Sequence, residues 1–139
     1  MSAEENKAIS RRFIEEIWSK GNLPVVDEII AANFVRHDPA DAAPVSGCEG
    51  IKQVVAMYRT AFPDLKFTVE EQIAEGDKVV TRWTSNATHQ GELLGIPATG
   101  KKTSVTGIHI ARLAGGKVVE EWNNWDTIGL MRQLGVISA

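Results

Sequence analysis

The hydrophobic positions in the first 62 residues of the chain repeat with the period of an α-helix. One apolar stripe runs along residues 2–20, a shorter one along residues 24–31, and a third along residues 46–62, where a proline follows. The first and third segments begin with a serine and a glutamate at the spacing of a capping box, namely Ser2 with Glu5 and Ser46 with Glu49. The pattern therefore predicts three N-terminal helices.

After residue 63 the hydrophobic period changes to two, which is typical of β-strands. Residues 65–89 hold two β-rich runs around a Glu-Gly-Asp turn, and residues 102–125 hold two more around a Gly-Gly turn. A short helix is expected over residues 127–134. Helices first and a strand meander afterwards predict an α+β fold, in which three helices pack on one face of a curved four-stranded antiparallel sheet. A cavity between the two layers is a natural ligand site.

The composition adds several exclusions to this picture. A chain of 139 residues fits one domain spanning residues 1–139, and its net charge of −3 supplies no basic face for nucleic acid. No apolar run approaches the roughly 18 residues of a membrane span, and the acidic N-terminus is unlike a signal peptide. The single cysteine, Cys48, cannot form an internal disulfide, so the cytoplasm is the expected compartment. The three histidines lack a local metal-ligand spacing, so no metal is expected.

The glycine pair at 115–116 decides which side chains of the last two strands share a face. A two-residue turn puts His109 opposite Trp122, whereas a three-residue turn with a glycine bulge puts it opposite Glu121. Asp126 belongs to the face of His109 in the first register. In the second register, the residues that join His109 are Glu121, Asn123 and Trp125.

Asp126 stands directly before the last predicted helix and can cap it, which is worth about 1 kcal/mol. Its other possible role is that of an acid in the pocket. Because the cap is a sufficient explanation for this residue, we favour the three-residue turn. The candidates for the cavity lining are then His109, Glu121, Asn123 and Trp125, although a tryptophan here also suits core or interface packing.

His109 is the first candidate for proton transfer. It stands between two small residues, Gly107 and Ala111, that leave space around an imidazole, and imidazole titrates near neutrality. A hydrogen-bonded core histidine is the other interpretation. Glu121 could orient His109 or act as the base itself if burial raised its pKa, whereas an exposed strand carboxylate is the alternative.

Further residues are candidates for ligand contacts. His37 and Asp38 precede a proline, either as polar groups at the mouth of the pocket or as parts of a turn. His89 ends a strand beside a glycine and could lie at the pocket rim. Arg82 and Trp83 alternate on one strand, so only one of them faces inward, and an inward arginine could bind a carboxylate or an enolate.

Three stretches of the chain resemble the SnoaL-like polyketide cyclases of the nuclear-transport-factor-2-like superfamily. They are "NKAISRRFIEEIWSKGNLPVVDEIIAANFVRHDP", "THQGELLGIPATGKK" and "GIHIARLAGGKVVEEWNNWDTIGLMRQLG". The resemblance covers nearly the whole chain and implies the cone-shaped fold of that group. The same scaffold hosts isomerases, dehydratases, epoxide hydrolases and binding domains, so the resemblance indicates the fold more specifically than the chemistry.

The characterised cyclases of this family close a ring by an intramolecular aldol reaction, without a metal or an organic cofactor. The resemblance places the assisting histidine of the family at His109 and its acid/base aspartate at Asn123, with Asp126 three residues further on. An amide can donate to an oxygen or accept from one, but it cannot take a proton from carbon. The chain therefore departs from the family pattern at the catalytic carboxylate.

These features predict a cofactor-independent enzyme of the cyclase, isomerase, or lyase/hydrolase type, which carries out acid/base proton transfer on a small hydrophobic oxygenated metabolite such as a polyketide-like compound. His109 would move the proton, Asn123 would bind an oxygen and Glu121 would support them. The alternative is a non-catalytic domain of the same fold that binds a small hydrophobic ligand. Under either prediction a homodimer through the sheet is expected, because an uncovered sheet face still has apolar residues to bury.

Overall fold

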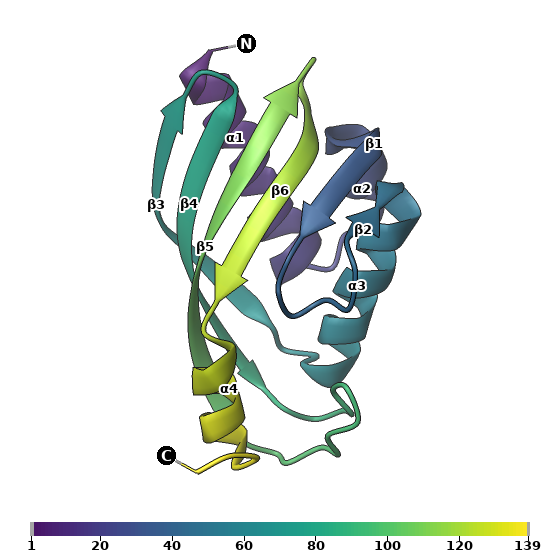
Figure 1. The fold of residues 1–139 in the computed structure, drawn as a ribbon, viewed down its shortest axis with the longest axis vertical. Helices are drawn as coiled ribbons and strands as arrows, with labels where there is room; N and C mark the ends of the chain where they lie inside the picture. The colour runs from purple at the N-terminus through teal and green to yellow at the C-terminus, as the bar shows by residue number, and fades with distance from the viewer. Residues whose placement is uncertain (1, 139) are drawn as a thin grey trace.

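The computed structural model describes residues 2–138 and shows an α+β fold (Figure 1). The helical elements are α1 (Ala3–Arg12), the π-helical segment η1 (Phe13–Ser19), α2 (Pro24–Ile29), α3 (Gly47–Ala61) and α4 (Thr127–Leu134). The strands are β1 (Ile30–His37), β2 (Val45–Ser46), β3 (Lys66–Glu75), β4 (Lys78–Thr88), β5 (Lys102–Ala114) and β6 (Lys117–Trp125). The segment η1 continues α1 directly, because Arg12 between them stays helical.

The strands form one six-stranded sheet in the order β2-β1-β6-β5-β4-β3. The four predicted strands are the antiparallel meander β3 to β6. The predicted strand number was too low, because β1 pairs in parallel with β6 and β2 pairs with β1. The second predicted helix was also too long: α2 ends at Ile29, and Ile30 already has the extended backbone of β1. The partner of β1 lies more than 80 residues away in the sequence, so its pairing leaves no local signal.

Two of the predicted helix caps are confirmed and one is wrong. The Ser2 hydroxyl accepts a hydrogen bond from the backbone N–H of Glu5 at 3.1 Å, and the Glu5 carboxylate accepts one from the Ser2 N–H at 3.4 Å. Asp126 caps α4 by accepting from the Gly129 N–H at 2.8 Å. Ser46 begins α3 without any side-chain cap bond, so the second capping box does not form.

The apolar stripes of η1, α2 and α3 pack against the concave face of the sheet, and α1 lies behind the strands in the view of Figure 1. Phe13, Val26 and Val55 are fully buried in this core. The helices contact β1, β3, β4 and β6, and the sheet curves around the helices. Within residues 2–138 none of the helices has the length and apolar character needed to cross a membrane.

The β5–β6 hairpin combines features of both registers considered from the sequence. Its turn has two residues, Gly115–Gly116, both at positive φ, so the predicted three-residue turn was wrong. One extra residue in β6, Val119, then shifts the register. His109 therefore lies opposite Asn123 rather than Glu121. Compared with a two-residue turn alone, the bulge reverses which residues of β6 point inward. The predicted inner face is therefore confirmed: it carries His109 on β5 and Glu121, Asn123 and Trp125 on β6.

Candidate functional site

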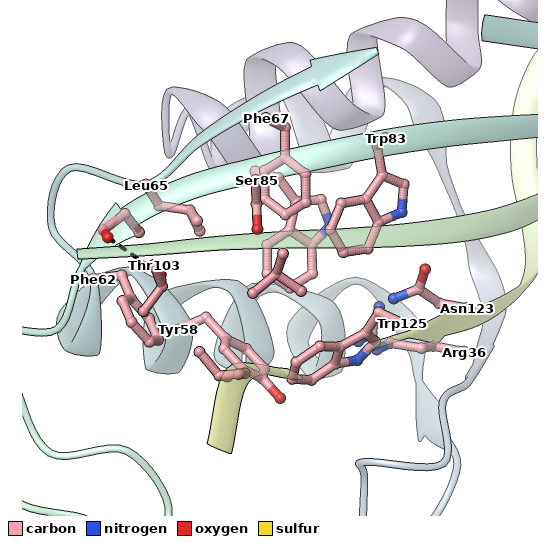
Figure 2. A pocket seen from close by; sticks show the side chains of 14 residues that line it. Arg36, Tyr58, Phe62, Leu65, Phe67, Trp83, Ser85, Thr103, Asn123 and Trp125 are labelled. Atoms are coloured by element: carbon pink, nitrogen blue, oxygen red, sulfur yellow. Dashed lines mark hydrogen bonds between the residues drawn. The ribbon is translucent and has the colours of Figure 1, made fainter. Parts of the chain in front are cut away.

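A cavity of about 60 Å³ lies between α3 and the concave face of the sheet (Figure 2). The aromatic side chains that line it are Trp18, Tyr58, Phe62, Phe67, Trp83 and Trp125. They come from η1, α3, the residue that follows α3, and β3, β4 and β6, so the cavity forms only when helices and sheet are packed together. A largely apolar lining with a few polar side chains is typical of a site for a hydrophobic small molecule.

Asn123 presents the amide group of this lining, and its neighbours determine how the amide is turned. Its Nδ2 donates to Asp38 Oδ2 at 3.0 Å. Within residues 2–138 the second N–H of this nitrogen makes no hydrogen bond, and the Oδ1 of the same amide is buried without a partner. Figure 2 shows the nitrogen on the pocket side of the side chain. Asp38 itself is fully buried and also accepts from the Trp125 indole N–H at 3.1 Å. One carboxylate thus orients two side chains of the cavity wall.

Arg36 lies under this end of the cavity and is 2% exposed. Its guanidinium donates to three carboxylates, those of Asp38, Asp41 and Glu121. Burial alone would lower the pKa of Arg36, but the three carboxylates outweigh burial and raise it further above its ordinary value. Burial raises the pKa of Asp41, although Arg36 opposes that shift. In this buried cluster, three carboxylates therefore share one arginine.

His109 completes the cluster from β5. Its Nε2 lies 3.2 Å from Glu121 Oε2, yet the two atoms are not aligned as a hydrogen bond. Both ring nitrogens are buried without a hydrogen-bond partner among the described residues. Phe13 covers the ring, with centroids 5.8 Å apart. Burial tends to raise the pKa of Glu121, but Arg36 and the nearby His109 outweigh it and hold this pKa below its ordinary value.

The imidazole of His109 does not line the cavity, because it is packed against Phe13 and is 2% exposed. Its cross-strand neighbour Asn123 provides the contact with the cavity. The structure thus brings the three predicted catalytic residues, His109, Glu121 and Asn123, into one buried group. Asp38 and Trp125, which the sequence analysis assigned to ligand contacts, join this group through hydrogen bonds.

Three other predicted contact residues lie away from the cavity. Arg82 points outward and pairs with Glu71 at 2.7 Å, because strand parity turns Trp83 inward in its place. His37 lies on the outer face of the sheet, where it bonds to Glu120. His89 is fully buried beside the cavity rather than in its lining, and its Nδ1 accepts from the Thr99 N–H at 3.2 Å. Arg82, His37 and His89, which were predicted to contact a ligand, therefore do not line this cavity.

Sequence reasoning missed two residues that shape the site. Arg36 was overlooked because a charged residue in a short strand is ordinarily exposed, and its partner Glu121 is 85 positions away. Tyr58 was assigned to the apolar stripe of a helix, where its hydroxyl gave no separate signal. Burial raises the pKa of Tyr58 to about 12, so the hydroxyl stays neutral and can donate. In the part of the chain that the structure describes, no group of three or more acidic, histidine or cysteine side chains is arranged to hold a metal.

Comparisons with known proteins agree with this architecture. The sequence matches the profile of the SnoaL-like polyketide cyclases over residues 8–134. It is 29% identical to aklanonic acid methyl ester cyclase DnrD of Streptomyces peucetius over 127 residues, which is 90% of this chain and 87% of the relative. It is 27% identical to nogalonic acid methyl ester cyclase of Streptomyces nogalater over 119 residues, covering 85% and 89% of the two chains. A solved structure from Acidithiobacillus ferrooxidans superposes with a TM-score of 0.85 at 34% identity, over 98% of this chain and 99% of that one.

The fold is that of the nuclear-transport-factor-2-like proteins, in which a curved open sheet wraps around helices. The chain belongs to the SnoaL-like polyketide cyclase family. Its relatives include cyclases, and this membership supports a cyclase-type enzyme.

Proposed function

We propose that this protein is a cofactor-independent enzyme that transfers a proton next to a carbonyl group of a small hydrophobic, oxygenated metabolite such as a polyketide-like compound. The observation that carries the proposal is the Asn123 amide at the wall of an aromatic cavity, beside a buried histidine on the neighbouring strand and two buried carboxylates. Loss of that proton produces an enolate, whose oxygen is stabilised best by donors already aimed at it.

Asn123 is suited to bind the oxygen of the ligand. Asp38 holds one N–H of the amide at 3.0 Å, so the amide keeps its orientation whether or not a ligand is present. A donor that is fixed before the reaction needs no reorganisation when negative charge develops. This role makes use of an amide at the position where the family has an acid/base carboxylate.

We assign the proton uptake to His109, which the ligand must reach past Asn123 or through one bridging water, because the imidazole is not part of the cavity lining. The Asp38 carboxylate accepts bonds from Arg36, Asn123, Trp125 and the backbone N–H of Ala40, so both of its oxygens are already occupied. Glu121 is bonded to Arg36 through Oε1 only, and although burial raises its pKa, Arg36 and His109 outweigh burial and hold this pKa below its ordinary value. The two nitrogens of His109 make no hydrogen bonds among the described residues, which leaves them free for proton exchange. Glu121, 3.2 Å away, would stabilise the imidazolium that forms.

A non-catalytic ligand-binding domain is the second candidate function. It is favoured by one observation, namely that the polar side chains in the cavity lining are neutral apart from the fully paired guanidinium of Arg36. Such a lining binds a hydrophobic molecule without a proton acceptor in direct contact with it.

Proton exchange and ring closure distinguish the two functions. The protein is incubated with aklanonic acid methyl ester in deuterated water, and both deuterium uptake next to the carbonyl and the cyclised product are followed by NMR. We expect uptake with the wild type. Asn123→Ala should lower kcat/KM about 100-fold through loss of the oxygen donor. Asn86→Ala, an exposed asparagine on β4, serves as the matched control and should stay within about twofold, because it contributes no interaction in the transition state.

Each outcome decides between the candidates. Binding of the ester, seen as quenching of tryptophan emission, without deuterium uptake would support the binding domain and contradict the enzyme. Uptake that survives both Asn123→Ala and His109→Ala would remove these residues from the mechanism.

We also propose that two copies of the chain associate through the outer face of the sheet. That face carries exposed apolar side chains, Ile73 at 61% and Ile108 at 51% exposure. In register with Ile73 lie Val80, Ile110 and Trp122, so an apolar row crosses neighbouring strands, and Ile108 stands two residues from Ile110 on β5. An apolar sheet face of this kind favours association with a second copy.

A further inference from the structure

The cavity beside Asn123 is small for a metabolite with several rings. Its volume is about 60 Å³, whereas sites for drug-sized ligands enclose roughly 300–1,000 Å³. A second hollow of about 400 Å³ adjoins it, which we call the outer hollow. The two spaces share Tyr58 and Trp125, whose rings pack edge to face with centroids 6.3 Å apart. These two rings form the partition between the spaces.

The wall of the outer hollow contains a tight turn in which Leu94 has an unfavourable backbone conformation. Leu93 and Ile96 exchange backbone hydrogen bonds of 3.0 and 2.8 Å, and the residues between them, Leu94 and Gly95, have φ of +48° and +85°. Positive φ at both central positions is the pattern of a type I′ turn, where asparagine followed by glycine is preferred. Within residues 2–138, Leu94 is the one non-glycine residue at positive φ.

Neither packing nor turn formation explains a leucine at position 94. Its side chain is 60% exposed, so it adds little to the core, whereas its neighbour Leu93 is 1% exposed and anchors the turn. The Leu94 side chain lines the outer hollow. A strained backbone that persists at the edge of a hollow is a feature of ligand-binding segments. The strain is accounted for if the leucine covers an apolar part of a ligand.

We propose that the outer hollow is the second half of the ligand site, and that Leu94 is its apolar contact for a distal ring of a multi-ring, oxygenated ligand. This inference rests on the proposed function, because the reacting end of the same ligand lies beside Asn123. Such a ligand occupies both spaces, and the Tyr58 and Trp125 rings turn aside to admit it.

Tyr58 adds a polar contact at the junction. Among the groups that shift its pKa none is a hydrogen-bond partner, and burial raises the pKa of Tyr58 to about 12. It therefore remains a neutral donor for an oxygen substituent midway along the ligand. This arrangement requires a molecule with oxygen atoms at more than one ring.

The inference is tested by binding of two phenols of different length. The probes are 4-methylphenol, with one ring, and 1,8-dihydroxyanthraquinone, with three, and binding is followed by quenching of tryptophan emission. We expect Leu94→Asn to weaken anthraquinone binding about tenfold, through loss of one apolar contact. The affinity for 4-methylphenol should stay within about twofold. Because asparagine is favoured at this turn position, the same variant should melt at a higher temperature than the wild type.

Two controls separate the contact from other effects. Leu94→Met keeps an apolar side chain and should keep the affinity for the anthraquinone. Ile73→Asn removes an apolar side chain that is 61% exposed on the outer face and should change neither probe. Unchanged anthraquinone binding in Leu94→Asn, or an equal loss for both probes, would overturn the two-part site while leaving the proposed function in place. If the wild type binds neither phenol, the proposed ligand class itself is wrong, and this inference with it.

Discussion

Strand β6 presents nearly the same residues to two very different environments. In the sequence "EEWNNW" each residue type occurs twice, once on each face of the sheet. On the inner face Glu121 is 1% exposed and lies 3.2 Å from His109. On the outer face Glu120 is 25% exposed and accepts from His37 at 2.8 Å. A glutamate–histidine pair therefore occurs twice, once buried in the core and once in contact with water.

The arginines that accompany the two glutamates differ in the same way. Arg36 is 3% exposed at its side chain and is shared by three carboxylates, whereas Arg112 is 37% exposed and pairs with Glu120 alone among residues 2–138. Water screens the outer ion pair, so this pair contributes little to folding stability. The inner charges are removed from water and are stabilised by one another instead. Burial, and not residue type, makes one face of β6 a candidate active site and the other a surface.

Removal of the arginine on each face gives the largest expected difference between them. Arg36→Met leaves three carboxylates at a buried site without their cation, so the free energy of unfolding should fall by about 4 kcal/mol. Arg112→Met should lower it by less than about 1 kcal/mol. Urea denaturation at pH 7 measures both changes. Equal losses would show that the inner cluster is as well solvated as the outer pair.

Removal of the glutamate charge has a smaller effect that depends on pH. The folded state holds the pKa of Glu121 below its ordinary value, because Arg36 and His109 outweigh burial. Such a carboxylate stabilises the protein above its unfolded pKa of about 4.3, and this stabilisation is lost as the pH falls through the lower folded value. We expect Glu121→Gln to cost about 3 kcal/mol at pH 7. Below pH 4 the variant should lose stability less steeply than the wild type.

The control for this prediction is Glu120→Gln. A hydrogen bond from His37 lowers the pKa of Glu120 too, but its exposure to water reduces the effect on stability. Unfolding free energies at several pH values between 2.5 and 7 give the slopes of the three proteins. An unchanged slope in Glu121→Gln would mean that this carboxylate does not contribute to acid unfolding.

The comparison of the two faces also shows what the sequence could and could not predict. The inner face of β6 was predicted correctly, although the turn that supported the prediction was not. The glycine pair 115–116 forms a two-residue turn, and the extra residue Val119 restores the face that a three-residue turn would have produced. Nothing in the local pattern marks Val119 as a bulge, because valine suits an ordinary strand equally well.

Long-range partners account for most of what was missed in the site. Strand β1 follows α2 without a break, and its pairing with β6 brings Arg36 to Glu121 across 85 residues. The periodic pattern of the helices and of the meander β3 to β6 was strong enough to predict the layers. It contained no information that Arg36 would be buried, since that depends on partners that meet only in the folded chain.

The smallest effect on folding stability, and the sharpest test of the outer face, comes from Ile108→Asp. This side chain is 51% exposed, so the substitution should change the unfolding free energy of one copy by less than about 0.5 kcal/mol. If the outer face joins two copies, a charge there should convert a dimer into a monomer in sedimentation velocity, because an unpaired buried charge is costly. Met57→Asp, at a position 36% exposed on α3, places the same charge on the opposite layer and should leave the dimer intact. A wild type that sediments as a monomer, or a dimer that only Met57→Asp disrupts, would contradict the outer-face interface and leave Trp122 a surface residue.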